Sequence, residues 1–168
     1  EINQVYQYLE STFMNQMTNA GIYFSDKKII SFLKCDYVIN GPNSNDYSVE
    51  VNSSYKQRIA KIPFVFVLKA SIEKRHPDFM FNTWLSNHYA WNNNFSPTDK
   101  QQALFSISTS DNRFDIGVIN QNVSNMIYFN ELAVPEQTPL SIQNISAFIH
   151  KDILLFKHLG INARYNYQ

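Results

Sequence analysis

The closest grouping of side chains that could bind a metal ion or transfer protons is His76, Asp78 and His88. Imidazole and carboxylate groups are common zinc ligands and common proton donors and acceptors in hydrolases. Zinc-binding spacings such as H-E-x-x-H are absent, and the three ligands would meet only if the loop after residue 76 folded back. A metal-dependent hydrolase built on these residues is therefore a minor alternative. A surface loop that starts a helix at Pro77 and Asp78 is the favoured interpretation.

Two further sets contain residue types that enzymes use in catalysis, but their sequence context or spacing does not fit a catalytic site. Cys35 could be a nucleophile with a distant histidine, but it lies in a strand-like pattern where a small buried hydrophobe is expected. Asp46, Glu50 and Lys56 follow the order of carboxylate, carboxylate and lysine used by metal-dependent nucleases, but their spacing differs. Glycine-rich phosphate loops and the G-x-S-x-G motif are absent. We therefore predict no catalytic residue, no metal ligand and no cofactor, which favours a non-enzymatic protein.

The strongest electrostatic feature is the segment 56–76, in which six lysines and arginines face a single acid, Glu73. Such clusters are typical of contacts with nucleic-acid phosphates, although the zero net charge of the chain argues against a dedicated nucleic-acid binder. The acidic residues between 111 and 136 would complement this segment in head-to-tail packing of identical subunits. We predict contact with nucleic acid or with a partner protein through Lys56, Arg58, Lys61, Lys74 and Arg75.

The composition is that of one folded domain with few charges. A chain of 168 residues with 44% hydrophobic residues can bury a core, so a single domain over residues 1–168 is expected. Charged residues make up only 17%, against the usual ~25%, which suits a subunit of an assembly. The longest apolar runs reach about half the ~20 residues of a membrane-crossing helix, so no membrane span is expected. The single cysteine excludes an internal disulfide, and the compartment is left open.

The first half of the chain predicts a helix followed by strands. Apolar residues recur at steps of three and four over residues 2–20, and Gly21 follows in the position of a helix cap. Strands are expected over residues 22–24 and 29–39, then a hairpin at Asn40 and Gly41 and an outer strand over 47–51. Residues 62–72 form the most continuously apolar run and predict a central strand buried on both faces.

The second half predicts a meander between two helices. Met80, Trp84, His88 and Trp91 would share one face of a short helix. Alternation then predicts strands over residues 103–109 and 114–118, and a third strand over 123–129 follows an expected turn at 120–122. Thr138 and Pro139 resemble a helix start, and isoleucines at 142, 145, 149 and 153 form a stripe that ends before Gly160.

This order indicates an α+β fold, with a mostly antiparallel sheet of about six to seven strands flanked by an N-terminal and a C-terminal helix. No motif identifies a family. The layout of helix, strand and strand, with Pro63-Phe64-Val65 opening an apolar strand, resembles ring-forming phage tail and secretion-apparatus proteins, and DNA-binding modules of restriction systems. We therefore expect a non-enzymatic interaction or assembly subunit that binds a protein partner or itself. The alternative is a nucleic-acid-binding module, for example of a defence system, that uses the basic segment 56–76.

Overall fold

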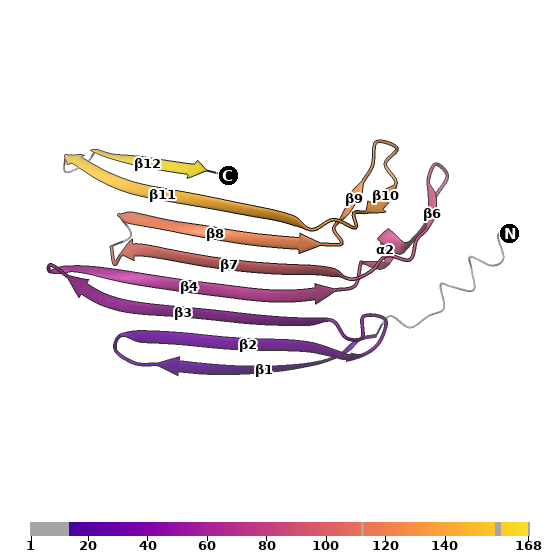
Figure 1. Ribbon diagram of the computed structural model, residues 1–168, viewed down its shortest axis with the longest axis horizontal. Coiled ribbons are helices and arrows are strands. Elements are labelled where there is room, and N and C mark those ends of the chain that lie inside the picture. Colours follow the sequence, from indigo (N-terminus) through magenta and orange to yellow (C-terminus); the bar gives the residue numbers. More distant parts are fainter. Residues whose placement is uncertain (1–13, 112, 157–158, 168) are drawn as a thin grey trace.

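One large antiparallel sheet dominates the protein. The computed structural model describes residues 14–111, 113–156 and 159–167. Its eight long strands are β1 (Gln16–Ser25), β2 (Ile29–Asn40), β3 (Tyr47–Ile59), β4 (Ile62–Arg75), β7 (Thr98–Thr109), β8 (Phe114–Ser124), β11 (Ile142–Phe156) and β12 (Leu159–Tyr167). They are hydrogen-bonded in the order β1-β2-β3-β4-β7-β8-β11-β12, so consecutive long strands are neighbours and β1 and β12 are the two edges. Figure 1 shows them as a single, gently curved layer.

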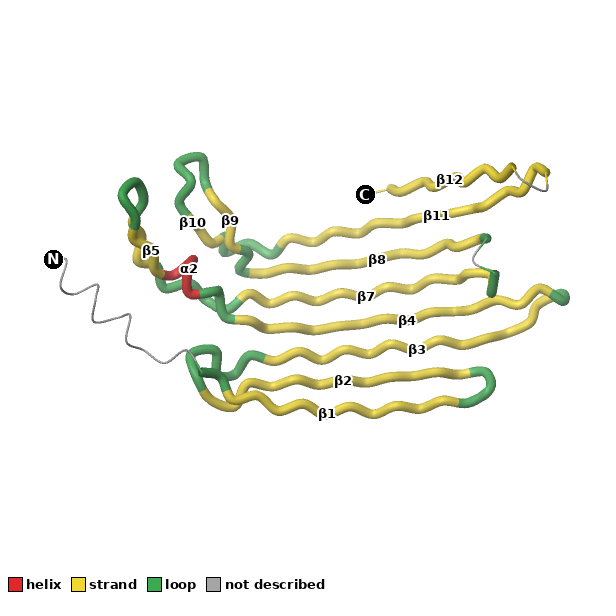
Figure 2. The backbone as a smooth tube through the Cα atoms, turned by 180° about the vertical axis from the view of Figure 1, so that it is seen from behind, coloured by secondary structure: helices red, strands yellow, loops and turns green. Residues whose placement is uncertain are grey.

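The connections between the strands differ at the two ends of the sheet. At one end, which we call the turn end, short turns over residues 26–28 and 60–61 join β1 to β2 and β3 to β4, and β7 ends only five residues before β8 begins. At the other end, the loop end, the connections span residues 41–46, 76–97 and 125–141. The two longest contain the helix α2 (Phe79–Asn82) with the hairpin of β5 (Thr83–Leu85) and β6 (Ala90–Asn92), and the hairpin of β9 (Ile127–Phe129) and β10 (Pro135–Gln137). Figure 2 shows this contrast in the green connections.

Local backbone chemistry fixes the turn between β3 and β4. Ile59 pairs with Ile62, so only Ala60 and Lys61 form the connection, and both have positive φ angles of 50° and 70°. Two residues with positive φ give the turn whose twist matches that of antiparallel strands. This tight turn sets the register along the whole β3–β4 pair.

A glycine in β8 makes room for an aromatic ring. Gly117 lies directly opposite Phe148 of β11, and a Cβ atom on Gly117 would lie 2.6 Å from the Phe148 ring. It would also lie 2.7 Å from the backbone oxygen of Phe105. Because carbon atoms cannot approach so closely, Phe148 can cover the strand only where β8 has a glycine.

The sheet has almost no core of its own. Among the described residues of the large sheet, Val38 is the one apolar side chain that is buried, at 7% exposure. Large apolar side chains such as Leu68 and Phe105 are about half exposed, at 50% and 48%. The described elements include no second layer against either face (Figure 1). Since folded domains are stabilised mainly by burying apolar surface, this sheet needs surroundings that cover its apolar side chains.

The expected α+β class is wrong. Residues 16–20 of the expected N-terminal helix belong to β1, and residues 2–13 lie outside the described part of the chain. The expected C-terminal helix is replaced by β11 and β12. The register explains the error, because Ile142 lies on one face of β11 whereas Ile145 and Ile149 lie on the other. Apolar residues on both faces of one strand produced a spacing of three and four that imitates a helix.

Of the remaining expected elements, the structure confirms some strands and turns and corrects others. The expected middle helix shrinks to α2, and Trp84 and Trp91 pair directly across the β5–β6 hairpin. Residues 123–129 are divided between the end of β8 and β9. The strands over 29–39 and 62–72 and the hairpin after Asn40 are confirmed, and β4 is near the middle of the sheet. It is not buried on both faces, as Leu68 shows. The eight strands form one sheet, which fits the single-domain interpretation.

Candidate functional site: the two faces of the sheet

One face of the sheet, which we call the apolar face, is lined mainly by aliphatic and aromatic side chains. Directly opposite residues in an antiparallel pair lie on the same face, and successive residues alternate, so the strand registers assign every position. The apolar face includes Ala20, Ile22, Phe24, Leu33, Cys35, Tyr37, Val49, Val51, Tyr55, Phe64, Phe66, Leu68, Ala70, Ile72, Ala103, Phe105, Ile107, Phe114, Ile116, Val118, Ile145, Ala147, Ile149, Tyr165 and Tyr167.

Charged residues on the apolar face are confined to its ends. Within the described strands of the large sheet, this face carries Lys74, Asp99 and Lys151 and no other charge. Lys74 and Asp99 are directly opposite each other at the loop end, whereas Lys151 lies near the turn end. The strip between them is therefore free of formal charge along the middle of each described strand.

The height of this strip matches the apolar interior of a membrane. At a rise of about 3.4 Å per residue, the steps from Ile62 to Ile72 cover about 34 Å along β4. A tilt of about 40°, usual for membrane-crossing strands, reduces this to about 26 Å. The apolar band of outer-membrane strand proteins is about 25 Å tall.

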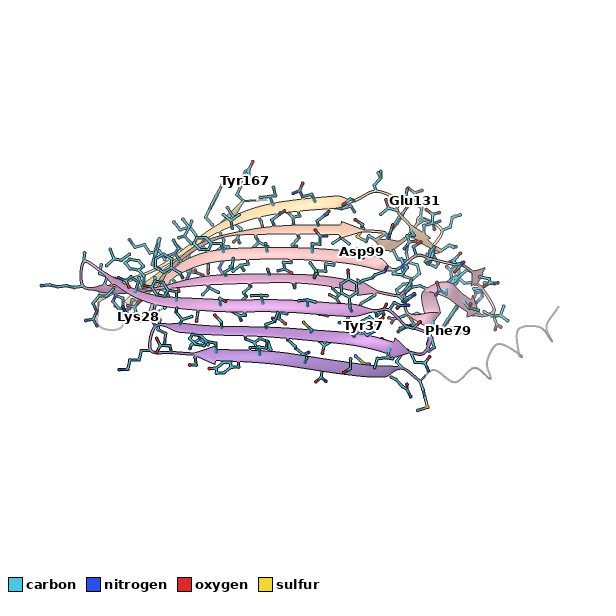
Figure 3. All side chains as sticks on the ribbon, turned by 60° about the horizontal axis from the view of Figure 1, so that its bottom comes forward. Lys28, Tyr37, Phe79, Asp99, Glu131 and Tyr167 are labelled. Carbon is cyan, nitrogen blue, oxygen red and sulfur yellow. The ribbon has the colours of Figure 1, made fainter. Side chains whose placement is uncertain are left out.

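Tyrosines near the two ends of the strip direct their hydroxyl groups away from its middle. Tyr37, near the loop end (Figure 3), donates a hydrogen bond to Asn45 Oδ1 in the β2–β3 loop at 2.8 Å. Tyr55, near the turn end, donates to Gln57 Oε1 at 2.9 Å, two residues closer to the turn. Amphipathic rings with this orientation are typical of a boundary between lipid and water.

Two serines on the apolar face pair with each other. Ser31 of β2 and Ser53 of β3 are directly opposite, and their hydroxyl oxygens are 3.0 Å apart. A hydroxyl group without a hydrogen bond is costly in an apolar environment. The pair therefore lets two polar residues lie within the strip at low cost.

The opposite face, which we call the polar face, carries most of the charges. On β2 to β7 its charged residues are Lys34, Asp36, Glu50, Lys56, Arg58, Lys69, Glu73, Arg75 and Lys100. On β8 to β12 they are Asp115, His150, Asp152 and Arg164. Serine, asparagine and glutamine occupy many of the positions between them, including Ser54, Ser71, Gln102 and Ser106. Such a face can be hydrated along its whole length.

Opposite charges are paired on the polar face near the loop end. Lys34 Nζ lies 2.7 Å from Asp36 Oδ2, and Arg75 forms an ion pair with Glu73. Glu73 is also directly opposite Lys100 on β7. A shallow hollow of about 280 Å³ lies among Glu50, Lys69, Glu73 and neighbouring residues on this face. The polar face thus presents both signs of charge to whatever lies in front of it.

The loop end contains a largely buried contact between a histidine and an aspartate. Nδ1 of His76 lies 2.6 Å from Oδ1 of Asp46, and the His76 backbone N–H donates to the same oxygen at 2.8 Å. Asp46 is buried, so the pair fastens the β2–β3 loop to the end of β4. Asp46, His76 and Asp78 all line a hollow of about 380 Å³ at this end of the sheet. In the described residues no group of three or more His, Cys, Asp or Glu side chains could hold a metal ion.

The other sequence-predicted catalytic residues are also separated. Cys35 lies on the apolar face, half-buried, opposite Val49 and Ala20. Glu50 and Lys56 share the polar face of β3 but are six residues apart, or about 20 Å along the strand. These positions offer no nucleophile with its base and no paired carboxylates.

The basic residues predicted to contact nucleic acid or a partner fall into two groups. Lys56, Arg58 and Lys61 lie at the turn end, whereas Lys74 and Arg75 lie at the loop end. Lys56 is opposite Val65, nine residues before Lys74 on β4, which is a separation of about 30 Å. The five residues therefore do not form one continuous patch. Whether either group contacts a partner stays a prediction.

Hydrogen bonds and aromatic rings join the two longest loops into one body, the loop cap. The side chain of Gln137 donates to the Ser96 carbonyl oxygen at 2.7 Å and accepts from the Ser96 N–H at 2.9 Å. The ring of Phe129 lies 5.8 Å from that of Phe81 and 6.3 Å from that of Trp91. Two segments far apart in the sequence thus support each other beside the end of the sheet.

The β9–β10 hairpin of the loop cap contains a shifted carboxyl group. Glu136 accepts a hydrogen bond from Asn130 Nδ2 at 2.7 Å and one from the Tyr128 hydroxyl at 2.9 Å. The bond from Asn130, and then that from Tyr128, lower the pKa of the Glu136 carboxyl. The hydrogen bond to Glu136 in turn raises the pKa of the Tyr128 hydroxyl.

Long antiparallel strands with one apolar and one polar face, short turns at one end and longer loops at the other, are typical of proteins that cross outer membranes as strands. Residues 8–168 match the family described as “Putative porin”, and the chain belongs to this family. No curated protein and no solved structure matches the chain. Within the described residues, no helix has the length and apolar character needed to cross a membrane.

Proposed function

We propose that this chain supplies membrane-spanning strands of a porin. Its apolar face lies against lipid, and its polar face lines a water-filled passage for small polar solutes. The observation that carries the proposal is the uncovered apolar strip, about 26 Å tall, on a single-layer sheet. Lipid would cover such a strip without a second protein layer. Membership of the porin family supports the same function and an outer-membrane location.

The expectation that the chain has no membrane span rested on the length of its apolar runs. That criterion applies to helices, which need ~20 residues, whereas a tilted strand needs about 9–11. The large sheet has strands of 10 to 15 residues, apart from the nine residues of β12. Because successive residues of a strand point to opposite faces, only every second residue needs to be apolar. A search for continuous apolar runs therefore does not detect such strands.

Water accessibility of neighbouring positions tests the proposal. Ala70 and Ser71 are adjacent near the middle of β4 and lie on the apolar and the polar face. We would prepare Ala70→Cys and Ser71→Cys, each with Cys35→Ser, and place the full chain in lipid vesicles. A membrane-impermeant maleimide should label the cysteine at 71 at least tenfold faster than the cysteine at 70. Both should react alike after unfolding in urea, which controls for intrinsic reactivity.

A second matched pair on β3, Val51→Cys and Asn52→Cys, should give the same contrast. Equal labelling on the two faces in vesicles would overturn the assignment of the apolar face to lipid. The passage has its own readout, which is ion conductance across a planar bilayer. Stable insertion without conductance would leave the membrane-spanning strands in place and remove the water-filled passage.

The expectation of an assembly subunit remains a prediction, and one observation favours it. Among the described strands none pairs with the outer edge of β1, and residues 16–25 contain no charge and no proline that would protect this edge. Edges of this kind readily pair with another strand. We propose that β1 pairs with a further strand of the membrane sheet, and cross-linking between cysteines at the β1 edge and the neighbouring strand would test this.

A further inference from the structure

Basic side chains gather at the turn end of the first four strands. Lys27 and Lys28 form part of the β1–β2 turn, Lys56 and Arg58 lie near the end of β3, and Lys61 is in the β3–β4 turn. We call these five residues the turn-end basic cluster. All five are exposed, and the backbone N–H of Lys56 donates to the Lys28 carbonyl oxygen at 2.7 Å. This bond holds the β1–β2 turn beside the last residues of β3, four residues before the β3–β4 turn begins.

The turn-end basic cluster has little compensating charge. Asp26 is the one acid in residues 25–30 and 55–63, so five cations stand against one carboxylate. In Figure 3, Lys28 lies at the end of the sheet opposite to Phe79 and Glu131. The two long loops at that other end, 76–97 and 125–141, contain no lysine or arginine and three acids. Positive charge is thus concentrated beyond one end of the strands.

The turn lysines of the turn-end basic cluster, Lys27, Lys28 and Lys61, lie where the strands and their apolar strip end, whereas Lys56 and Arg58 lie on the polar face of β3. Phe24, Ile29 and Tyr55 are exposed on the apolar face of the same strands, and Ile59 and Ile62 flank the β3–β4 turn. In a membrane, groups just beyond such a strip lie at the level of the lipid headgroups. Ammonium and guanidinium groups at that level attract phosphate oxygens of anionic lipids.

We infer that the turn lysines of the turn-end basic cluster, Lys27, Lys28 and Lys61, bind the phosphate groups of anionic phospholipids in the membrane leaflet reached by the short turns. The inference rests on the proposed function, because headgroups lie there only if the apolar face is in lipid. Nucleic acid offers the same phosphate chemistry. The structure favours lipid because the cluster adjoins the apolar strip, while Lys74 and Arg75, predicted to complete a nucleic-acid footprint, lie about 30 Å away.

The test uses the full chain in vesicles of phosphatidylcholine with phosphatidylglycerol. In the cluster variant, the three turn lysines are replaced: Lys27→Gln, Lys28→Gln and Lys61→Gln. A matched control removes three lysines away from the turns: Lys69→Gln, Lys74→Gln and Lys100→Gln. Native mass spectrometry after mild detergent extraction counts the phosphatidylglycerol retained relative to phosphatidylcholine. The cluster variant should lose this enrichment about tenfold or more, and the control should stay within about twofold.

Equal enrichment in the parent protein and the cluster variant would overturn the inference. So would complete displacement of the lipid signal by millimolar inorganic phosphate, which would indicate a site for free anions. A gel shift of short duplex DNA that the cluster variant loses, without lipid enrichment, would assign the cluster to nucleic acid. The cysteine labelling described above, repeated in pure phosphatidylcholine, separates the two hypotheses. If the sheet inserts there with the expected contrast, a failed lipid assay counts against the inference alone.

Discussion

A charge placed on the apolar face should destabilise the protein according to its depth in the membrane. The most informative substitution is Leu68→Arg, because Leu68 lies six residues from Ile62 and four from Ile72 on the same face of β4. These steps place it about 16 Å from one end of the strip and about 10 Å from the other, after correction for a tilt of about 40°. Leu68 is thus close to the midplane.

The expected cost follows from this position. Arginine at the midplane of a lipid-facing strand costs about 2–4 kcal/mol, and the cost falls to about 0–1 kcal/mol at the membrane boundary. We expect about 3 kcal/mol for Leu68→Arg and less than about 1 kcal/mol for Ile62→Arg, a difference of about thirtyfold or more in the folding equilibrium constant. On the polar face, Val67→Arg should remain close to the parent protein because its guanidinium group reaches water.

Urea unfolding of the three variants in lipid vesicles, followed by far-ultraviolet circular dichroism, measures these differences. The slope of the free energy of unfolding against urea concentration should be unchanged, so that midpoints can be compared. In water the sites at 62 and 68 would be equivalent, because both side chains are 50% exposed. Equal costs at 62 and 68, or a larger cost at 67 than at 68, would refute the assignment of the apolar face to lipid.

Three further predictions concern single features of the sheet and of the loop cap. Gly117→Ala should lower the free energy of unfolding by about 1–3 kcal/mol, because the alanine Cβ would overlap the ring of Phe148. Gly21→Ala is the control for the same urea assay. It should be tolerated, because the nearest atom to its Cβ would be 3.4 Å away. Ser31→Ala should lower the free energy of unfolding by about 1–2 kcal/mol, because it leaves the Ser53 hydroxyl without its hydrogen bond. The double variant with Ser53→Ala should lose less than the sum of the two single variants. A double-mutant cycle that shows simple additivity would contradict this. Because hydrogen bonds lower the pKa of Glu136, they stabilise the hairpin above the ordinary carboxyl pKa, and this contribution is lost as the pH falls through the lowered value. Nuclear magnetic resonance of the ring of its tyrosine partner should therefore change in acid, and should stay constant over that range in Glu136→Gln.

The strands and turns that sequence reasoning located are those with a simple period. Residues 29–39 and 62–72 combine β-branched and aromatic residues with clear turn signals, and the structure places strands there. The pair Asn40 and Gly41 predicted a reversal, which Gly41 supports with a φ angle of 116°. These features depend on local backbone preferences, which act in the same way in water and in lipid.

The C-terminal strands were missed because the rules applied assume one buried face and one wet face. In β11, isoleucine and phenylalanine occur on both faces, so the alternation is hidden and a helical spacing emerges. A second rule, that a continuous apolar run is buried on both faces, predicted that β4 lies inside a core. In a strand between lipid and water, one face is apolar and the other polar, and lipid covers the apolar face in place of a second protein layer.

The polar face was also readable in principle from the sequence. Every charged residue of β2 and β3 is even-numbered: Lys34, Asp36, Glu50, Lys56 and Arg58. That regularity over two strands indicates one face free of charge. A count of basic residues along the segment 56–76 mixes the two faces of the strands and hides this regularity. The location of the turn-end basic cluster needed the pairing of strands, which local sequence does not provide.

The loop cap has a mechanical consequence for transport. Gln137 and Phe129 join the connection after β8 to the connection after β4, so neither can swing away without breaking contacts with the other. If the polar face lines a passage, the cap gives its mouth a fixed aperture. Solutes would then be sorted there by their dimensions, and the permeability cut-off should be insensitive to temperature until the Gln137–Ser96 contact is removed.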